Sequence, residues 1–198
     1  VKGIDNVLTQ NPDIKLIITV DNGIVANEAV EYANKKGIDV IITDHHVPSK
    51  TLPKAFAIVH TTAVCGAGVA YLLSQEIKNQ KSNLKNKILN TKYKIPDTHL
   101  ELVVLATIAD LVPLVNANRI LVHFGLKALQ KTQRPGLLAL FKNTAIDKKN
   151  IGVYEIGHII APRLNAMGRL QSAMDSLRLV CTTKEKRATE LASNLSDT

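Results

Sequence analysis

The chain has 198 residues, of which 45% are hydrophobic and 21% are charged, a composition typical of a globular protein and not of a disordered or fibrous one. Its net charge of +8 favours polyanionic partners, although a surplus of lysine can equally form an ordinary solvated surface. No apolar run reaches the roughly 18 residues that a membrane-spanning helix needs. We therefore expect no contact with membranes. Cys65 and Cys181 lack the spacing of a metal site, so we expect reduced thiols and a cytoplasmic location.

The N-terminal half alternates short apolar runs with a helical pattern. Residues 14–20 (IKLIITV) form a β-branched run typical of a strand that is buried on both faces of a parallel sheet. Residues 24–36 carry apolar side chains near helical spacing, and Gly37 suits the end of that helix. Residues 38–43 (IDVIIT) and 55–60 (AFAIVH) predict two further strands. This order predicts an open α/β sheet of parallel strands with right-handed crossovers.

The remainder of the chain has mainly helical patterns. The Gly-rich stretch CGAGVAYLLSQEI predicts a turn that opens a helix, and the Lys-rich residues 79–94 predict an exposed connection. Helices are then expected over DTHLELVVLATIADLV, ANRILVHFGLKALQKT and RPGLLALFKN, followed by a loop, an irregular Pro/Gly segment (APRLNAMGRL) and two helices at 172–180 and 184–193. The predicted fold class is α/β, with a parallel Rossmann-like sheet and flanking helices followed by an all-helical segment.

Acidic and imidazole side chains follow two of the predicted strands. Asp21 ends the first strand, and Asp44, His45 and His46 end the second. Because neighbouring strands lie about 4.8 Å apart and parallel strands share one carboxyl edge, these side chains can converge on one point. Carboxylate oxygens and imidazole nitrogens together suit Mn²⁺, Mg²⁺ or Zn²⁺. The plain alternative is that the acids cap turns and the histidines face solvent.

Two other sets of polar residues stand out. Asp110 interrupts the apolar helical stretch LVVLATIADLVPL, where an embedded acid is costly unless it is paired or bound to a metal. A solvent-facing helix end would explain it as well, because Pro113 follows closely. Arg163, Asn165 and Arg169 lie close together in APRLNAMGRL, and guanidinium and amide groups at this density suit phosphate oxygens. The alternative is a structural loop whose arginines pair with acids.

Six segments together resemble the DHH phosphoesterase family: TVDNGI, VIITDHHVP, CGAGVAYLL, ATIADLVPL, NRILVHFGLKAL and APRLNAMGRL. The resemblance covers residues 16–170, and its last segments are similar to the branch that degrades single-stranded DNA from 5′ to 3′ in repair and recombination. It implies a hydrolase with two divalent ions, Mn²⁺ or Mg²⁺, that activate water for in-line attack on a phosphodiester. Single-stranded DNA is the implied partner, together with other repair or recombination proteins.

The resemblance also implies a role for each residue of the candidate site. Asp21 would bridge the metals, and His45 and Asp110 would ligate one of them. His46 would contact the scissile phosphate, or it would contact a metal ligand without binding the metal itself. Asp44 would orient an imidazole, as carboxylates beside metal ligands do.

The same resemblance leads us to expect a chain that is part of a longer protein. Residues 1–95 would form a partial α/β DHH subdomain, with the family's first Asp-rich motif upstream of it. Residues 96–198 would form the helical part of the core and the start of a connector to a further C-terminal domain. The chain is therefore expected to be inactive alone. Two alternatives stay open: a DHH phosphodiesterase for short RNA or cyclic dinucleotides, and a non-catalytic relative that binds DNA or a replication partner.

Overall fold

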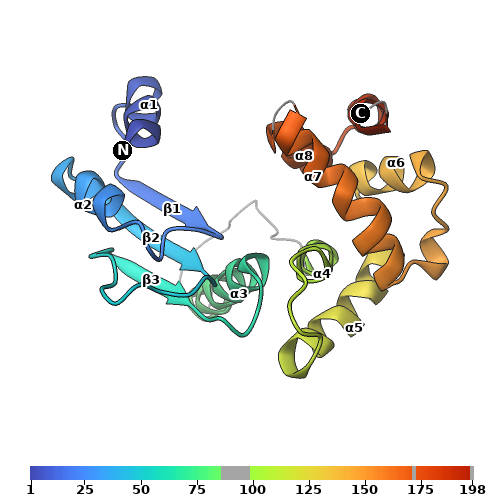
Figure 1. Cartoon of the computed structure of the whole chain (residues 1–198), viewed down its shortest axis with the longest axis horizontal. Coiled ribbons are helices and arrows are strands. Elements are labelled where there is room, and N and C mark those ends of the chain that lie inside the picture. The colour runs from blue at the N-terminus through green and yellow to red at the C-terminus, as the bar shows by residue number, and fades with distance from the viewer. Residues whose placement is uncertain (86–98, 171–172, 197–198) are drawn as a thin grey trace. The chain divides into compact units, whose positions relative to one another are not determined.

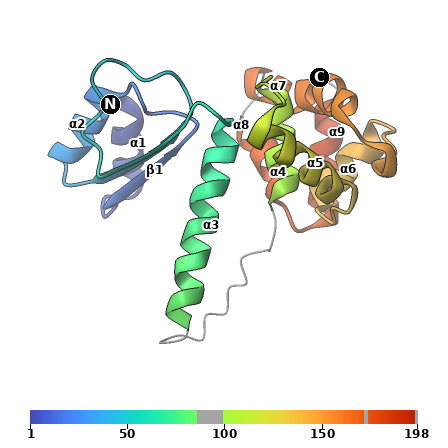
Figure 2. The ribbon, with the colours of Figure 1, turned by 90° about the horizontal axis from the view of Figure 1, so that it is seen from below.

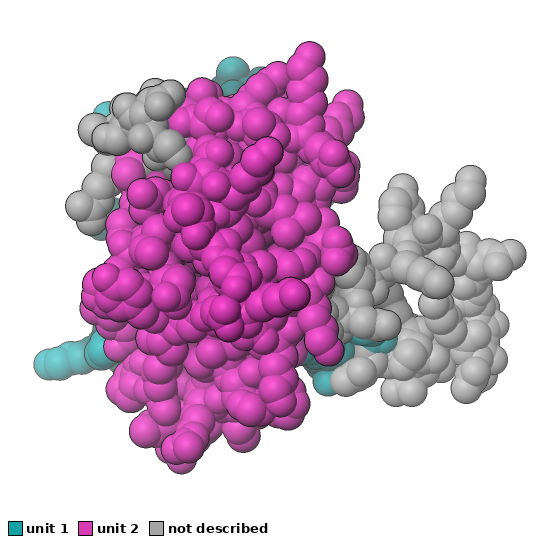
Figure 3. Space-filling model, turned by 90° about the vertical axis from the view of Figure 1, so that its right-hand side faces the viewer, with its two compact units in different colours: residues 1–97 teal, residues 98–198 magenta. Residues whose placement is uncertain are grey.

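The computed structural model describes residues 1–85, 99–170 and 173–196. The chain divides into two compact units, residues 1–97 and 98–198, which Figure 3 shows in teal and magenta. All strands of the described residues belong to the first unit, and the described part of the second unit is helical. No described helix is long and apolar enough to cross a membrane.

A three-stranded parallel sheet lies at the centre of unit 1 (Figure 1). Its strands are β1 (Leu16–Val20), β2 (Asp39–Asp44) and β3 (Ala57–His60), in the order β1-β2-β3. The register pairs Val20 with Thr43 and Asp44 with His60, so the carboxyl ends of all three strands lie along one edge. The predicted α/β class with a parallel sheet is confirmed.

Three helices complete the described part of unit 1: α1 (Lys2–Gln10), α2 (Asn27–Lys35) and α3 (Gly66–Lys85). Figure 2 shows α3 along its length. Gly37 follows α2 with a φ of +71°, as the prediction of a glycine at this helix end required. One apolar core joins α2 to β2, and its buried members are Val30, Ala33, Ile38, Val40 and Ile42.

Two expectations for unit 1 were wrong. Leu16, Ile18 and Val20 of β1 are about half exposed, because β1 is an edge strand of the described sheet and only its alternate residues face the core. Helix α3 continues to Lys85, well into the predicted connection at 79–94, since a Lys-rich polar stretch can extend a solvated helix as readily as a loop. The rest of that connection lies outside the described residues.

Unit 2 is built from six α-helices and two short irregular turns of helix in its described part. The α-helices are α4 (Leu100–Ala109), α5 (Asn116–Gln130), α6 (Pro135–Asn143), α7 (Ala161–Leu170), α8 (Ala173–Cys181) and α9 (Glu185–Ser196). The turns are a 3₁₀ segment, Lys148–Asn150, and a π-helical segment, Glu155–Ile160. A buried core that includes Val104, Leu129, Leu140 and Ile156 joins these elements.

Close helix packing and a partly buried ion pair hold unit 2 together. A Cβ atom on Gly125 of α5 would lie 2.6 Å from Cβ of Val104 on α4, so only glycine permits this approach. The Arg134 guanidinium donates to Glu101 Oε1 at 2.6 Å and also to the Val180 carbonyl at 3.3 Å. This pair ties the start of α6 to α4 and α8.

The segment APRLNAMGRL is helical, and the expectation of an irregular Pro/Gly segment was wrong. The π-helical turn runs directly into α7, and both belong to one continuous helical stretch. Pro162 lies inside this stretch, directly after the π-helical turn, where the altered hydrogen-bond pattern of a π turn can accommodate the missing N–H of proline. The proline therefore coincides with an irregular turn of the helix and does not end it.

Candidate metal site

A sharp turn presents Asp21 at the end of β1. Asp21 has a φ of +62°, an uncommon conformation that aspartate tolerates better than most residues. Its N–H donates to the Thr43 carbonyl at 2.9 Å, which continues the pairing with β2 by one residue. The Thr19 hydroxyl donates to the Asn22 carbonyl at 2.7 Å, and the Asn22 amide donates to the Val20 carbonyl at 3.0 Å. These bonds fix the backbone from which the Asp21 carboxylate projects.

Asp44 is buried at the end of β2, with a relative exposure of 1%, and its carboxylate accepts four hydrogen bonds. Oδ2 accepts the Ile24 N–H at 2.9 Å, and Oδ1 accepts the N–H groups of His45 at 2.7 Å and His46 at 3.2 Å. Oδ1 also lies 2.7 Å from Nδ1 of His46. Burial alone would raise the pKa of this carboxyl, but the bonds from Ile24, His46 and His45 lower the pKa from 3.8 to about 2.

His45 lies beside Asp21, and the two side chains face the same point. Nε2 of His45 is 3.1 Å from Oδ1 of Asp21. Two ligands on neighbouring corners of an octahedron, with bonds of about 2.1 Å, lie about 3 Å apart, so this spacing suits a shared divalent ion. With His46 the pair forms a group whose ligand atoms all lie within 4.8 Å of one another. One carboxylate and two imidazoles therefore fit a divalent transition metal.

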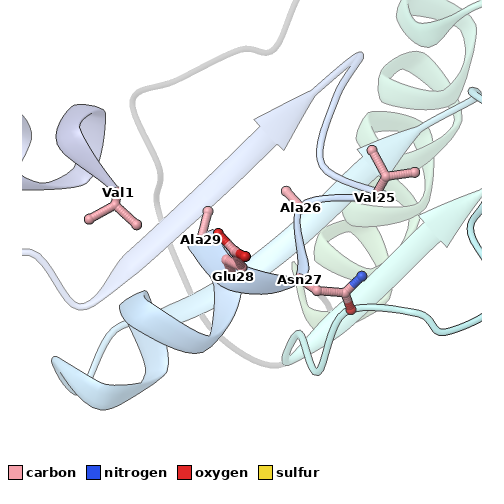
Figure 4. A pocket seen from close by; sticks show the side chains of 6 residues that line it. All are labelled: Val1, Val25, Ala26, Asn27, Glu28 and Ala29. Carbon is pink, nitrogen blue, oxygen red and sulfur yellow. The ribbon is translucent and has the colours of Figure 1, made fainter.

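The volume of a hollow does not identify this site. A hollow of about 460 Å³ lies at the start of α2. It is lined by Val1, Val25, Ala26, Asn27, Glu28 and Ala29 (Figure 4). None of these residues belongs to the group of Asp21, His45 and His46. The converging ligand atoms, and not a deep pocket, define the candidate site.

Gly66 opens α3 directly against the Asp21 side chain. A Cβ atom on Gly66 would lie 2.1 Å from Oδ1 and 2.6 Å from Cβ of Asp21. The whole Asp21 side chain would have to move, because the clash involves its base as well as its tip. The absence of a side chain at residue 66 is thus part of what places the carboxylate.

Replacing Gly66 with alanine should therefore weaken Mn²⁺ binding by roughly tenfold or more, in the range seen when residues that orient metal ligands are changed. Calorimetric titration of the chain with Mn²⁺ measures this. Gly3→Ala is the matched control, since a Cβ there meets nothing within 4 Å. Equal Mn²⁺ affinity in both variants would contradict the proposed role of the Gly66 contact.

The lowered pKa of Asp44 predicts a specific acid sensitivity. A carboxyl whose pKa falls from 3.8 to about 2 on folding adds stability above pH 4, and this stability is lost as the pH drops from about 4 to about 2. The loss should be of the order of 2 kcal/mol in the free energy of unfolding. Urea unfolding of the wild type and of Asp44→Asn, followed by NMR signals of β2, should show the two curves converging toward pH 2. A gap that stays constant with pH would argue against the hydrogen-bonded carboxylate.

Asp110 is exposed at the C-terminal end of α4, where it caps the helix. The expectation of an acid embedded among apolar side chains was wrong, because the helix ends at Ala109 and only the residues before it are packed in the core. The structure agrees with the alternative explanation, in which Asp110 faces solvent at the end of the helix. Asp110 belongs to unit 2, so its convergence with Asp21 and His45 stays a prediction.

Arg163 and Asn165, two of the residues predicted to bind phosphate, lie on different sides of α7. The Arg163 guanidinium donates to the Ile159 carbonyl one turn earlier, at 2.9 Å. Asn165 is exposed and lines two adjoining cavities, of about 250 and 340 Å³, whose other walls are mostly Leu, Ala and Val side chains. Residues two apart on a helix face different sides, so Arg163 and Asn165 do not form one cluster. The side chain of Arg169 lies outside the described residues.

The sequence analysis missed His60, the last residue of β3. Its ring Nε2 lies 2.7 Å from the backbone carbonyl oxygen of His46. The available signal was its position, since His60 ends the third strand as Asp21 and Asp44 end the first two. The signal was missed because a single histidine at the end of the apolar run AFAIVH is not part of a recognisable motif.

Comparison with known proteins identifies the family. The profile described as "DHH family, N-terminal domain" matches residues 2–107, which include Asp21 and the Asp44-His45-His46 triplet. The chain belongs to the DHH family, and the resemblance predicted from its motifs is confirmed. It is 37% identical over 189 residues to the single-stranded-DNA-specific exonuclease RecJ of Bacillus subtilis strain 168, a match that covers 91% of this chain and 22% of that protein. With RecJ of Escherichia coli K12 it shares 35% identity over 193 residues, covering 91% and 33%.

Solved RecJ structures share the fold. RecJ of Thermus thermophilus in complex with Mn²⁺ superposes with a TM-score of 0.83 at 30% identity, covering 98% of this chain and 29% of that one. A second structure, of exonuclease RecJ bound to manganese, gives a TM-score of 0.82 at 30% identity and covers 98% and 49%. The chain thus spans well under half the length of the curated relatives that it matches.

Proposed function

We propose that this chain forms part of a metal-dependent hydrolase that degrades single-stranded DNA from 5′ to 3′ in repair and recombination. The observation that carries the proposal is the convergence of Asp21, His45 and His46 at the carboxyl edge of a parallel sheet. The likeness to RecJ proteins, which are named as single-stranded-DNA-specific exonucleases, supports the substrate. A cytoplasmic location and contacts with other repair proteins belong to the same proposal.

Mn²⁺ or Mg²⁺ is the proposed cofactor, in agreement with the metals named for the solved RecJ structures. When bound, such ions supply an activated water and neutralise charge on the phosphodiester. Asp21 and His45 would hold the ion. Asp44 accepts a hydrogen bond from Nδ1 of His46, which makes Nε2 the nitrogen that can approach the ion or a phosphate oxygen.

The position of Asp110 supports its role as a further ligand. It stands at the C-terminal end of α4, where the helix dipole is negative and a second negative charge is unfavourable. A divalent cation beside Asp110 would offset both charges. The ligand role is therefore consistent with the exposed setting, because a cation can approach the carboxylate from outside the helix.

We expect Arg163 and Arg169 to contact the DNA backbone, with Asn165 as a separate contact on another side of α7. Replacing Arg163 with alanine should weaken single-strand binding about equally for all sequences and reduce the salt slope by about one. Fluorescence anisotropy with several oligonucleotides at three salt concentrations measures both quantities. Arg187→Ala is the control, since Arg187 pairs with Glu190 on the exposed face of α9. A loss of thermal stability with unchanged DNA affinity would show that Arg163 is only structural.

A chimera tests the proposed activity, because the chain alone is expected to be inactive. This chain would replace the matching stretch of Bacillus subtilis RecJ. With Mn²⁺ the chimera should release the 5′-terminal nucleotide of labelled single-stranded DNA and leave duplex DNA intact. A folded chimera that cuts only short RNA or cyclic dinucleotides would favour the phosphodiesterase alternative. One that binds DNA without cutting it would favour a non-catalytic protein.

A further inference from the structure

His60 is the register partner of Asp44 across the parallel ladder of β2 and β3. Both residues contact His46, from the ends of two neighbouring strands. Nε2 of His60 lies 2.7 Å from the His46 carbonyl oxygen, and a carbonyl oxygen can only accept. Nε2 of His60 therefore carries a proton and donates it to this bond.

His46 is thus held from the ends of two strands. The Asp44 carboxylate holds its ring through Nδ1 at 2.7 Å and its N–H at 3.2 Å, and the His60 ring holds its backbone carbonyl at 2.7 Å. The chain beyond His46 leaves the sheet in an irregular connection, where Val47 is 80% exposed. The bond from His60 ties the start of this connection to the end of β3.

We infer that His60 is a positioning residue, which fixes the backbone of His46 so that the ring of His46 faces the candidate metal site. His60 does not act as a ligand itself, since the group of close ligand atoms in the described part of the chain contains Asp21, His45 and His46. The consequence for metal binding rests on the proposed function. The geometric role concerns the metal-free protein and stands apart from that function.

Substitutions at His60 separate the hydrogen bond from the bulk of the ring. In His60→Gln the side-chain amide offers a donor at nearly the reach of Nε2, whereas His60→Leu fills similar space without a donor. His123→Leu is the matched control, because His123 is exposed on α5 and contacts the Phe124 ring edge-on. Thermal melting of all three variants verifies that each is folded.

The first measurement uses the metal-free chain. Two-bond ¹H–¹⁵N NMR at pH 8 reports which ring nitrogen of a neutral histidine carries the proton. The wild type should show His46 as a single Nδ1–H tautomer, and His60→Gln should keep it. His60→Leu should show a mixture of tautomers for His46. An unchanged single tautomer in His60→Leu would overturn the inference.

The second measurement is a calorimetric titration with Mn²⁺. We expect His60→Leu to bind about fivefold more weakly, the effect of losing one ordinary hydrogen bond, with His60→Gln and His123→Leu within twofold of the wild type. An equal loss in His60→Leu and His60→Gln would overturn the role of the donor. If the wild type binds no Mn²⁺, the proposed metal-dependent function is contradicted. The tautomer measurement alone then decides the role of His60.

Discussion

Replacing Asp21 with asparagine should lower the Mn²⁺ affinity of this chain by roughly a hundredfold or more, above the effect of changing a residue that only supports a ligand. Asp21 supplies the sole carboxylate in the group of close ligand atoms found among the described residues, and both of its partners are imidazoles. Asparagine keeps the shape of the side chain but removes the negative charge that a divalent ion needs. Calorimetric titration at pH 8 measures the change.

Asp39→Asn is the matched control, because Asp39 begins β2 at the opposite end of the strand and is exposed. The control should bind Mn²⁺ as the wild type does. We expect the wild type to bind one ion weakly, since the described residues hold one group of close ligand atoms, with a single carboxylate. Two tight sites in the wild type, or full affinity in Asp21→Asn, would contradict this account.

Replacing Gly136 with alanine should lower the free energy of unfolding of unit 2 by about 3 kcal/mol, the upper range for a forced steric overlap. A Cβ at residue 136 would lie 1.7 Å from the Leu179 carbonyl oxygen and 2.6 Å from its carbon. Both atoms are backbone atoms of α8, so no change of rotamer relieves the overlap. Helices α6 and α8 would have to move apart.

Urea unfolding followed by NMR signals of α6 measures this loss. Gly157→Ala is the control in the same unit, since a Cβ there would lie 3.6 Å from Cγ2 of Ile108, an ordinary contact distance. The control should stay within about 0.5 kcal/mol of the wild type, as most tolerated substitutions do. A stable Gly136→Ala variant would show that α6 and α8 are not packed as closely as described.

The strands and the placement of Asp21, His45 and His46 beside one another were predictable because their signals are local. A β-branched run that ends in Asp21, or in Asp44-His45-His46, indicates both the strand and the polar edge where it stops. The partners within the triplet were not predictable. Three consecutive residues can turn in several ways, and only the structure shows that Asp44 contacts the ring of His46 and that Asp21 contacts His45.

Contacts between distant segments account for what sequence reasoning missed. His60 and Gly66 look ordinary in the sequence, and they matter because they meet His46 and Asp21 across the fold. The half-exposed face of β1 was mispredicted because an apolar run does not tell an edge strand from a central one. The segment APRLNAMGRL was predicted to be irregular because of its Pro and Gly, but a π-helical turn directly before Pro162 lets the helix continue through it.

Diffraction from crystals of this chain soaked in Mn²⁺, recorded near the manganese absorption edge, tests the central claim most directly. The account predicts an anomalous peak within coordination distance of Oδ1 of Asp21 and Nε2 of His45. The same peak should disappear in Asp21→Asn crystals that keep the fold. A peak at another place, or well-ordered Asp21 and His45 side chains with no peak between them at saturating Mn²⁺, would contradict the account.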